Sequence, residues 1–368
     1  MGSASTILFA GGGSGGHISP GLAIAERVRE QSPMTHALFA CSQRAIDREM
    51  LDDAGESWVA LPASPPSIRP GAAIRFVLNF RASVKIVRGL IAEKNVSHVV
   101  ALGGFVAAPA VAAARGRVPV TLVNLDAPPG KANRWMAKKC DRVLTAIELP
   151  MMPHFAKRVV GLPIRRRAQA PADAHECRAR LGLDPAAPVL LVTGASQGAT
   201  SINELMMELA RSHHELFAGW QVLHLAGRGA DEPLRQAYAE AGIAALVMPF
   251  LHEMGLAWGS ADVAISRAGA NSVAEADANA VPTVFLPYPH HRDMHQKHNA
   301  QPLVDRGGAI MVIDQIAANA NAMAMMPVLK RLLGDVEVRA AMRRSLKREG
   351  RIDAAEAIAR EILGPPVD

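Results

Sequence analysis

The chain has 368 residues, enough for two domains of the usual size. Apolar residues make up 49% of it and charged residues 20%, which is typical of a globular protein and excludes an intrinsically disordered chain. Its net charge of +6 suits anionic lipid or phosphorylated substrates, whereas four Trp, two Tyr and no aromatic–basic stacking pattern argue against a nucleic-acid partner.

Three scattered cysteines, Cys41, Cys140 and Cys177, provide neither a disulfide framework nor the spacing of a metal site. This pattern favours a reducing, cytosolic environment. The first ten residues have no basic region and lead directly into a glycine loop, so we expect no signal peptide here.

The first half of the chain alternates short apolar runs with helical patterns, which predicts a parallel, doubly wound sheet. A helix is expected over residues 20–30. The expected strands cover residues 6–10, 36–40, 98–102, 119–123 and 142–145.

A glycine loop, residues 11–17, joins the first strand to the first helix. It satisfies the dinucleotide fingerprint, but the second strand ends at Ser42 without the carboxylate that a nicotinamide site needs, and no Lys follows Gly16. The pattern therefore indicates a backbone anion site at a helix N-terminus, with His17 at its edge. The alternative is a tight turn in which His17 only caps the helix.

Residues 69–94 are rich in cations, with six Lys or Arg against Glu93 alone. Read as a helix over 74–91, they place an apolar stripe, expected to face the core, on one side: Val77, Phe80, Val84, Val87 and Ile91. The neighbouring face begins with apolar residues and continues with cations: Ile74, Leu78, Arg81, Lys85 and Arg88. That face is either solvated or in contact with a membrane.

Residues 96–114 carry no formal charge, and their length approaches the roughly 20 residues of a membrane-spanning helix. We interpret them instead as a strand, a tight loop at Gly103 and Gly104, and a helix with Pro109 in its first turn.

The alternation stops in Pro/Ala-rich sequence around residues 161–163 and 168–174, which predicts a hinge, and then restarts. The further strands are expected over 189–193, 222–225, 245–248, 263–266 and 283–286. We expect domains over 1–163 and 164–345, and a C-terminal segment, 346–368, whose helix over 352–363 packs back on the first domain.

Two loops of the second half have the features of a nucleotide-sugar site. Residues 194–198 form another glycine loop, in which Ser196 adds a hydroxyl donor for phosphate, although a plain turn is equally compatible. Residues 266–275 place a helix N-terminus at a strand end, and Glu275 in that helix could accept hydrogen bonds from ribose hydroxyls. The alternative is a solvated helix residue.

Residues 287–299 form a histidine-rich loop, which raises the question of a metal. His291 and His295 have the i, i+4 spacing of zinc ligands, but the Pro-rich start argues against a helix through His291. We expect no metal here.

Taken in order, these loops closely resemble the GT-B transferases that add N-acetylglucosamine to undecaprenyl-diphospho-muramyl pentapeptide in peptidoglycan synthesis. The match spans residues 5–345. It includes residues 11–17 with Ile18 and Pro20, residues 103–105 with Pro109, Ala127, Pro129, Gly130, Asn133, Arg134, Gly161, Pro163, Arg165, residues 194–198 with Asn203, Pro249, Phe250, Met254, residues 266–275, Asp293, His295, Gln296 and Asn299.

The resemblance implies an α/β protein of the GT-B fold, with two Rossmann-like parallel-sheet domains facing across a cleft. It further implies an inverting, UDP-sugar-dependent N-acetylglucosaminyltransferase that needs no metal or other cofactor. Its partners would be a UDP-sugar donor, a lipid-linked diphosphate acceptor and an anionic membrane surface. The enzyme would be cytoplasmic and peripheral on the inner face of the cell membrane.

Residue roles follow from the same resemblance. His17 would be the general base. Ser196 and Arg165 would bind the UDP diphosphate, the backbone around Leu251 the uracil, Glu275 the ribose, and Gln296, with His295, the sugar. The implied donor residues are Ser14, Gly15, Arg165, Ser196, Leu251, Glu275 and Gln296. The implied acceptor residues are Gly13, Gly16, Gly104, Asp126 and Asn133. The implied membrane-facing residues are Ile74, Leu78, Arg81, Lys85 and Arg88.

Two departures from the family pattern lie in the acceptor half. Residues 123–126 read Val-Asn-Leu-Asp where the family has His-Glu-Gln-Asn, and Phe105 and Ala107 replace the usual Tyr and Ser. These changes leave open a GT-B transferase for another lipid such as diacylglycerol. Two further alternatives are a UDP-N-acetylglucosamine 2-epimerase, which shares the fold, and an inactive nucleotide-sugar-binding module.

Overall fold

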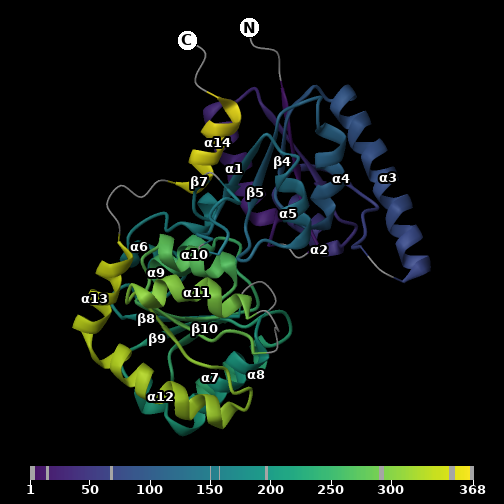
Figure 1. Cartoon of the computed structure of the whole chain (residues 1–368). Coiled ribbons are helices and arrows are strands. Elements are labelled where there is room, and N and C mark those ends of the chain that lie inside the picture. The colour runs from purple at the N-terminus through teal and green to yellow at the C-terminus, as the bar shows by residue number, and fades with distance from the viewer. Residues whose placement is uncertain are drawn as a thin grey trace. The chain divides into compact units, whose positions relative to one another are not determined.

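The computed structural model describes residues 5–13, 16–66, 69–149, 151–156, 158–194, 198–289, 294–347 and 353–364. The chain divides into two compact units (Figure 1). Unit 1 contains Met1–Arg165 and Ile352–Asp368, and unit 2 contains Arg166–Arg351. Each unit is built on one parallel sheet with a hydrophobic core on both faces, which confirms the predicted pair of parallel α/β domains.

The sheet of unit 1 has the strand order β3-β2-β1-β4-β5-β6-β7, and every pairing is parallel. The central strand β1 pairs with β2 in a register that runs from Thr6 opposite His36 to Ala10 opposite Ala40. The strands are β1 (Thr6–Ala10), β2 (His36–Cys41), β3 (Ser57–Ala60), β4 (Val96–Ala101), β5 (Val120–Asn124), β6 (Arg142–Thr145) and β7 (Arg158–Val159).

Strand β1 is buried on both faces, which is why its sequence is uniformly apolar. Ile7 and Phe9 face one core, and Leu8 and Ala10 face the other. The helices of unit 1 are α1 (Ile18–Gln31), α2 (Ala45–Asp52), α3 (Pro70–Glu93), α4 (Gly104–Ala114), α5 (Lys131–Ala137) and α14 (Ala354–Leu363).

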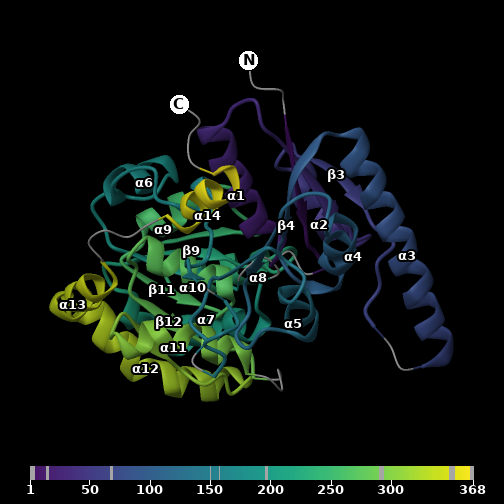
Figure 2. The same ribbon diagram turned by 45° about the horizontal axis from the view of Figure 1, so that its top comes forward.

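Helix α14 comes from the far end of the chain and lies beside α1 (Figures 1 and 2). Its apolar side chains recur at i, i+3, i+4 and i+7, so they form one face that enters the same core as Ile24 and Val28 of α1. These side chains are Ala355, Ile358, Ala359 and Ile362.

The sheet of unit 2 has the order β10-β9-β8-β11-β12-β13 and is also parallel throughout. Its strands are β8 (Val189–Thr193), β9 (Gln221–Leu225), β10 (Ala245–Met248), β11 (Val263–Ser266), β12 (Thr283–Phe285) and β13 (Ala309–Met311). Its helices are α6 (Ala174–Arg180), α7 (Thr200–Ser212), α8 (Asp231–Glu240), α9 (Met254–Ser260), α10 (Ala270–Ala278), α11 (His295–Asp305), α12 (Ala318–Gly334) and α13 (Val336–Leu346).

Two local expectations need correction. Helix α4 begins at Gly104, so Pro109 lies in its second turn and not in its first. The start is set by Gly103 and Gly104, whose φ values of 109° and 75° suit glycine and let the chain turn sharply after β4. Val77, expected in the core, is 44% exposed, because the first turns of α3 extend past the rest of unit 1 (Figures 1 and 2).

Candidate active site

The first glycine loop follows β1 and leads into α1 in unit 1. Gly12 and Gly13 have φ values of 146° and 102°, which L side chains rarely adopt. The predicted donor residues Ser14 and Gly15 lie outside the described residues, and Gly16 is exposed. The loop therefore has the glycine-dependent backbone that an anion site requires.

The buried carboxylate of Asp47 holds this loop through a hydrogen bond. Asp47, in the first turn of α2, accepts hydrogen bonds at Oδ2 from Gly13 N (2.7 Å), Ser42 N (3.2 Å) and Ser42 Oγ (2.5 Å). The side chain of the exposed Arg44 donates to the Gly13 carbonyl. The Gly13 N–H, predicted to bind the acceptor, is thus already bonded to Asp47, a residue that no sequence motif identified.

His17 stands at the N-terminus of α1, half-buried beside the second glycine pair. A Cβ on Gly103 would lie 3.2 Å from its Nε2, which would crowd the ring, whereas a Cβ on Gly104 would lie 3.5 Å from its Cε1, in ordinary contact. Its Nδ1 is buried and has no hydrogen-bond partner among the described residues. An imidazole in this position can accept a proton from a nearby hydroxyl.

Two buried asparagines organise the neighbouring loops. Asn133 accepts a hydrogen bond from Gly104 N (3.3 Å) and donates to Asn124 Oδ1 (2.8 Å). Asn124 in turn donates to the carbonyl of Asp126 (2.7 Å) and to Thr145 Oγ1 (3.1 Å). The Asn133 side chain is therefore engaged in holding the loops, whereas the Asp126 carboxylate is exposed.

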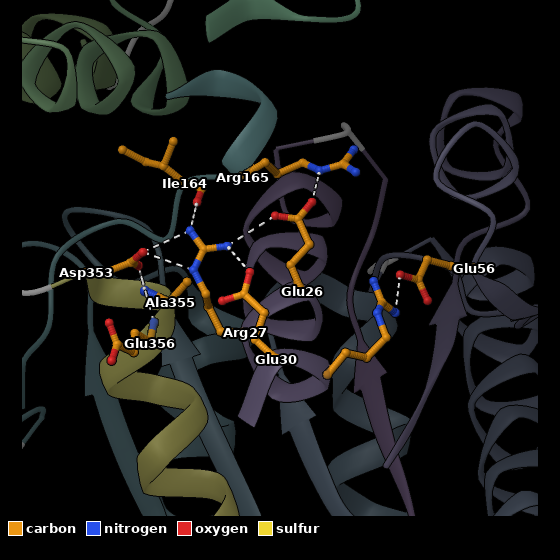
Figure 3. A network of polar contacts seen from close by, with 10 residues as sticks. Glu26, Arg27, Glu30, Glu56, Ile164, Arg165, Asp353, Ala355 and Glu356 are labelled. Carbon is orange, nitrogen blue, oxygen red and sulfur yellow. Dashed lines mark hydrogen bonds and ion pairs between the residues drawn. The ribbon is translucent and has the colours of Figure 1, made fainter. Parts of the chain in front are cut away.

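Arg165 is the last residue of the first segment of unit 1 and belongs to a partly buried ionic network (Figure 3). Its Nε donates to Glu26 Oε1 at 2.8 Å, and its buried Nη1 has no hydrogen-bond partner among the described residues. Arg27, next to Glu26 on α1, is fully buried and donates to Asp353 Oδ2 through Nε (3.0 Å) and Nη2 (2.8 Å), and to the Ile164 carbonyl (3.3 Å). The network orients the Arg165 guanidinium and ties it to α1.

Glu275 lies in the second turn of α10 in unit 2, partly buried. Its Oε2 accepts a hydrogen bond from Trp258 Nε1 at 2.9 Å. Burial raises the pKa of Glu275 to about 7. The hydrogen bond from Trp258 and the charge of Arg167 act in the opposite direction but are weaker than the effect of burial. The interpretation of Glu275 as a merely solvated helix residue is therefore wrong.

Gln296 and Leu251 also lie in loops or helix starts that follow strands of unit 2. Gln296, in the first turn of α11, accepts a hydrogen bond from Tyr288 N at 2.9 Å and so holds the segment after β12. His295 begins α11, and Leu251 follows β10 and is partly buried. Ser196, like His291, lies outside the described residues. Among the residues that the structure describes, no cluster of three His, Cys, Asp or Glu side chains could hold a metal ion.

The predicted membrane-facing residues lie on one exposed face of α3. Ile74 is 63% and Leu78 is 60% exposed, and the three cations that follow them are exposed as well: Arg81, Lys85 and Arg88. A second apolar group adjoins this helix, because Phe80 packs edge-to-face on the half-exposed Trp135, over which Lys139 Nζ lies 4.8 Å from the ring centroid. Of the helices in the described part of the chain, none is long and apolar enough to cross a membrane.

Comparisons with known proteins match both units. The chain matches the Glycosyltransferase family 28 N-terminal domain over residues 7–145 and the corresponding C-terminal domain over 189–357. A Nocardioides protein named UDP-N-acetylglucosamine–N-acetylmuramyl-(pentapeptide) pyrophosphoryl-undecaprenol N-acetylglucosamine transferase is 35% identical over 362 residues, which covers 97% of each chain. A Geobacter sulfurreducens protein of the same name is 32% identical over 97% of this chain and 98% of its own.

Solved structures share the fold. MurG from Acinetobacter baumannii superposes with a TM-score of 0.72 at 23% identity, over 98% of this chain and 99% of its own. A UDP-glucosyltransferase from Polygonum tinctorium superposes with a TM-score of 0.64 at 17% identity, over 99% of this chain and 100% of its own. Both carry the same pair of parallel-sheet domains.

Proposed function

The chain belongs to glycosyltransferase family 28, and we propose that it transfers N-acetylglucosamine from UDP-N-acetylglucosamine to undecaprenyl-diphospho-muramyl pentapeptide in peptidoglycan synthesis. One observation carries this proposal. Relatives that bear this activity in their names match nearly the full length of both chains, so the likeness includes the acceptor half as well as the donor half.

The donor would bind at the carboxyl ends of the strands of unit 2, where ligands of parallel sheets bind. Glu275 would accept hydrogen bonds from the ribose hydroxyls, and the backbone around Leu251 would hold the uracil. The amide of Gln296 would contact the sugar hydroxyls. Ser196 and the Arg165 guanidinium would bind the diphosphate.

His17 would act as the general base toward the acceptor, whose diphosphate would lie near the first glycine loop. The acceptor hydroxyl oxygen attacks the anomeric carbon, the bond from that carbon to the UDP oxygen breaks, and His17 takes the hydroxyl proton. The sugar is transferred with inversion, and UDP leaves with the bonding electrons. Helix N-termini at the strand ends supply positive potential for the leaving diphosphate.

We further propose that the exposed face of α3 attaches the protein to the inner face of the cell membrane. Apolar Ile74 and Leu78 would enter the lipid interface, while Arg81, Lys85 and Arg88 would lie against anionic headgroups. The exposed Trp135 beside Phe80 supports this, because tryptophan favours the membrane–water interface.

A panel of acceptors tests the proposal. The protein is incubated with UDP-N-acetylglucosamine and, separately, a short-chain lipid-diphospho-muramyl pentapeptide or diacylglycerol, and UDP release is measured. We expect UDP release with the muramyl acceptor and none with diacylglycerol. Faster release with diacylglycerol would show that the altered loops at Phe105 and Asp126 accompany a different lipid acceptor, and no acceptor-dependent release would contradict transferase activity.

A further inference from the structure

A buried ion pair lies at the carboxyl end of the sheet of unit 2. Arg267 directly follows β11, and Asp314 follows β13. Arg267 Nη1 lies 2.6 Å from Asp314 Oδ2, and the two residues are only 8% and 4% exposed. Because removing charges from water is costly, such a pair persists only when further hydrogen bonds satisfy it.

Those further bonds reach the segments after four neighbouring strands. Arg267 Nη1 also donates to the carbonyl of Leu286, which follows β12 (2.9 Å). Arg267 Nη2 donates to Ser201 Oγ (2.6 Å), and Ser201 Oγ donates to Asp314 Oδ2 (2.6 Å). Ser201 lies in the first turn of α7, after β8. Since β8, β11, β12 and β13 are adjacent in the sheet, one ion pair joins all four strand ends.

The second oxygen of Asp314 holds its own turn. Oδ1 accepts hydrogen bonds from Ile316 N (2.8 Å) and Asn321 Nδ2 (2.9 Å). Ile316 has a φ of +67°, an uncommon and strained conformation for a β-branched residue, so the surrounding bonds must maintain it. Burial would raise the pKa of Asp314, but hydrogen bonds from Ser201, Asn321 and Arg267 outweigh it and lower the pKa, which keeps the carboxylate ionised.

The same pair is linked to the predicted donor residues. The loop that begins at Arg267 leads into α10, which carries Glu275. The Arg267 guanidinium also lies over the Tyr288 ring, 5.5 Å from its centroid, and the Tyr288 N–H is bonded to Gln296. A displacement of Arg267 would therefore shift the side chains of Glu275 and Gln296.

We propose that Asp314 is a positioning residue for the donor site, and that it acts through Arg267 to hold the strand-end segments that bind the UDP-sugar. The inference rests on the proposed function, because it requires the donor to bind at the carboxyl ends of this sheet. It adds to that function a residue outside all the motifs that carry the family resemblance.

The experiment compares two ion pairs of unit 2, one at the carboxyl ends of the strands and one at their amino ends. Asp262 Oδ2 accepts from Arg178 Nη2 (2.7 Å) and from Val189 N (2.9 Å) at the amino ends of β11 and β8. Both Asp314→Asn and Asp262→Asn should lower the melting temperature. At a temperature well below either transition, we expect calorimetry to show about tenfold weaker UDP binding for Asp314→Asn and unchanged binding for Asp262→Asn. The donor KM of Asp314→Asn should rise in parallel, and its acceptor KM should not change.

A milder variant keeps the test decisive if Asp314→Asn does not fold. Ser201→Ala removes one hydroxyl from the network, and we expect UDP binding about two- to fivefold weaker. Equal UDP affinity in the folded Asp314, Ser201 and Asp262 variants would overturn the positioning role, provided that Glu275→Ala weakens binding. If Glu275→Ala also binds UDP like the wild type, the donor site itself has been misplaced, and the proposed function fails with it.

Discussion

Glu275 combines a cost in stability with a predicted gain in binding. Its carboxylate is held beside Trp258, where burial raises its pKa to about 7. A raised pKa in the folded state means that the folded protein keeps a proton that the unfolded chain has already lost. Stability therefore falls as the pH rises from the ordinary glutamate value of 4.5 through about 7. A residue that destabilises the free protein at neutral pH is typical of a binding site.

Glu275→Gln tests both sides of this balance. The amide can still accept from Trp258 but has no charge to desolvate, so the variant should be more stable than the wild type at pH 8, by on the order of 1–3 kcal/mol, and the difference should vanish below the ordinary glutamate pKa of 4.5. UDP affinity at pH 8 should fall by roughly one to two decades, because the ribose loses a charged acceptor. Thermal unfolding and calorimetry measure the two effects. A stability difference that does not depend on pH would contradict the buried carboxylate, and unchanged affinity would contradict the ribose assignment.

His17→Ala addresses the reaction step. If His17 removes the acceptor proton, its loss should lower kcat by roughly 10²–10⁴-fold while UDP affinity stays near that of the wild type, because a general base acts in the transition state. Steady-state kinetics and UDP titration separate the two quantities. Collapse of UDP binding would instead assign His17 to the donor site or to folding, since its ring packs against Gly103 and Gly104.

Candidate site residues within continuous motifs could be proposed from the sequence. Residues that contact a motif from a distant part of the sequence could not. Glu275 and His17 belong to loop–helix patterns of fixed spacing. Asp47 supports Gly13 from 34 positions away, and Asp314 joins Arg267 from 47 positions away. Nothing in their local sequence distinguishes these carboxylates from ordinary surface ones, because their role arises only when the sheet brings distant loops together.

Helix α3 shows what hydrophobic periodicity can predict about a single element. The sequence predicted a helix over 74–91, and the structure has one over Pro70–Glu93. The stripe of predicted core residues is buried only toward the C-terminal half, where Val84, Val87 and Ile91 meet the core and Val77 does not. Periodicity identifies a face but not how far the neighbouring elements extend along it. Helix α2 and the strands β3, β7 and β13 were not predicted, because each is short.

The exposed face of α3 makes a membrane prediction. Each cation near an anionic surface contributes about 1 kcal/mol, so the triple variant Arg81→Glu, Lys85→Glu, Arg88→Glu should abolish co-sedimentation with anionic vesicles and leave UDP binding intact. Attachment of the wild type should also weaken as salt is added.

The matched control reverses three exposed cations of unit 2: Lys330→Glu, Arg331→Glu, Arg344→Glu. It changes the net charge of the protein by the same amount, and we expect it to retain more vesicle binding than the α3 variant. Equal loss in both would show that net charge, and not α3, governs attachment.

At the scale of the whole molecule, Arg27 joins segments from three parts of the chain. It bonds to Ile164 just before the chain leaves unit 1 and to Asp353 just after the chain returns (Figure 3). Asp353 also caps α14 by accepting from Ala355 N and Glu356 N. One buried guanidinium thus fastens the C-terminal helix to α1.

Arg27→Met should cost on the order of 3 kcal/mol in the stability of unit 1, because it leaves the partly buried carboxylate of Asp353 without its cation. Hydrogen exchange should show the largest loss of protection in α14. The control Arg360→Met removes an ion pair with Glu356 within α14, but both side chains are exposed (70% and 37%), so the cost should be below about 1 kcal/mol. Equal effects of the two variants would contradict the fastening role of Arg27.

The most direct test of the account is to identify the reaction product. The protein is incubated with UDP-N-acetylglucosamine and a short-chain lipid-diphospho-muramyl pentapeptide, and the lipid fraction is analysed by mass spectrometry. The account predicts a lipid product heavier by one N-acetylhexosamine residue, formed in step with UDP and nearly absent with His17→Ala. An unmodified lipid, with UDP released at the same rate whether or not the acceptor is present, would contradict it.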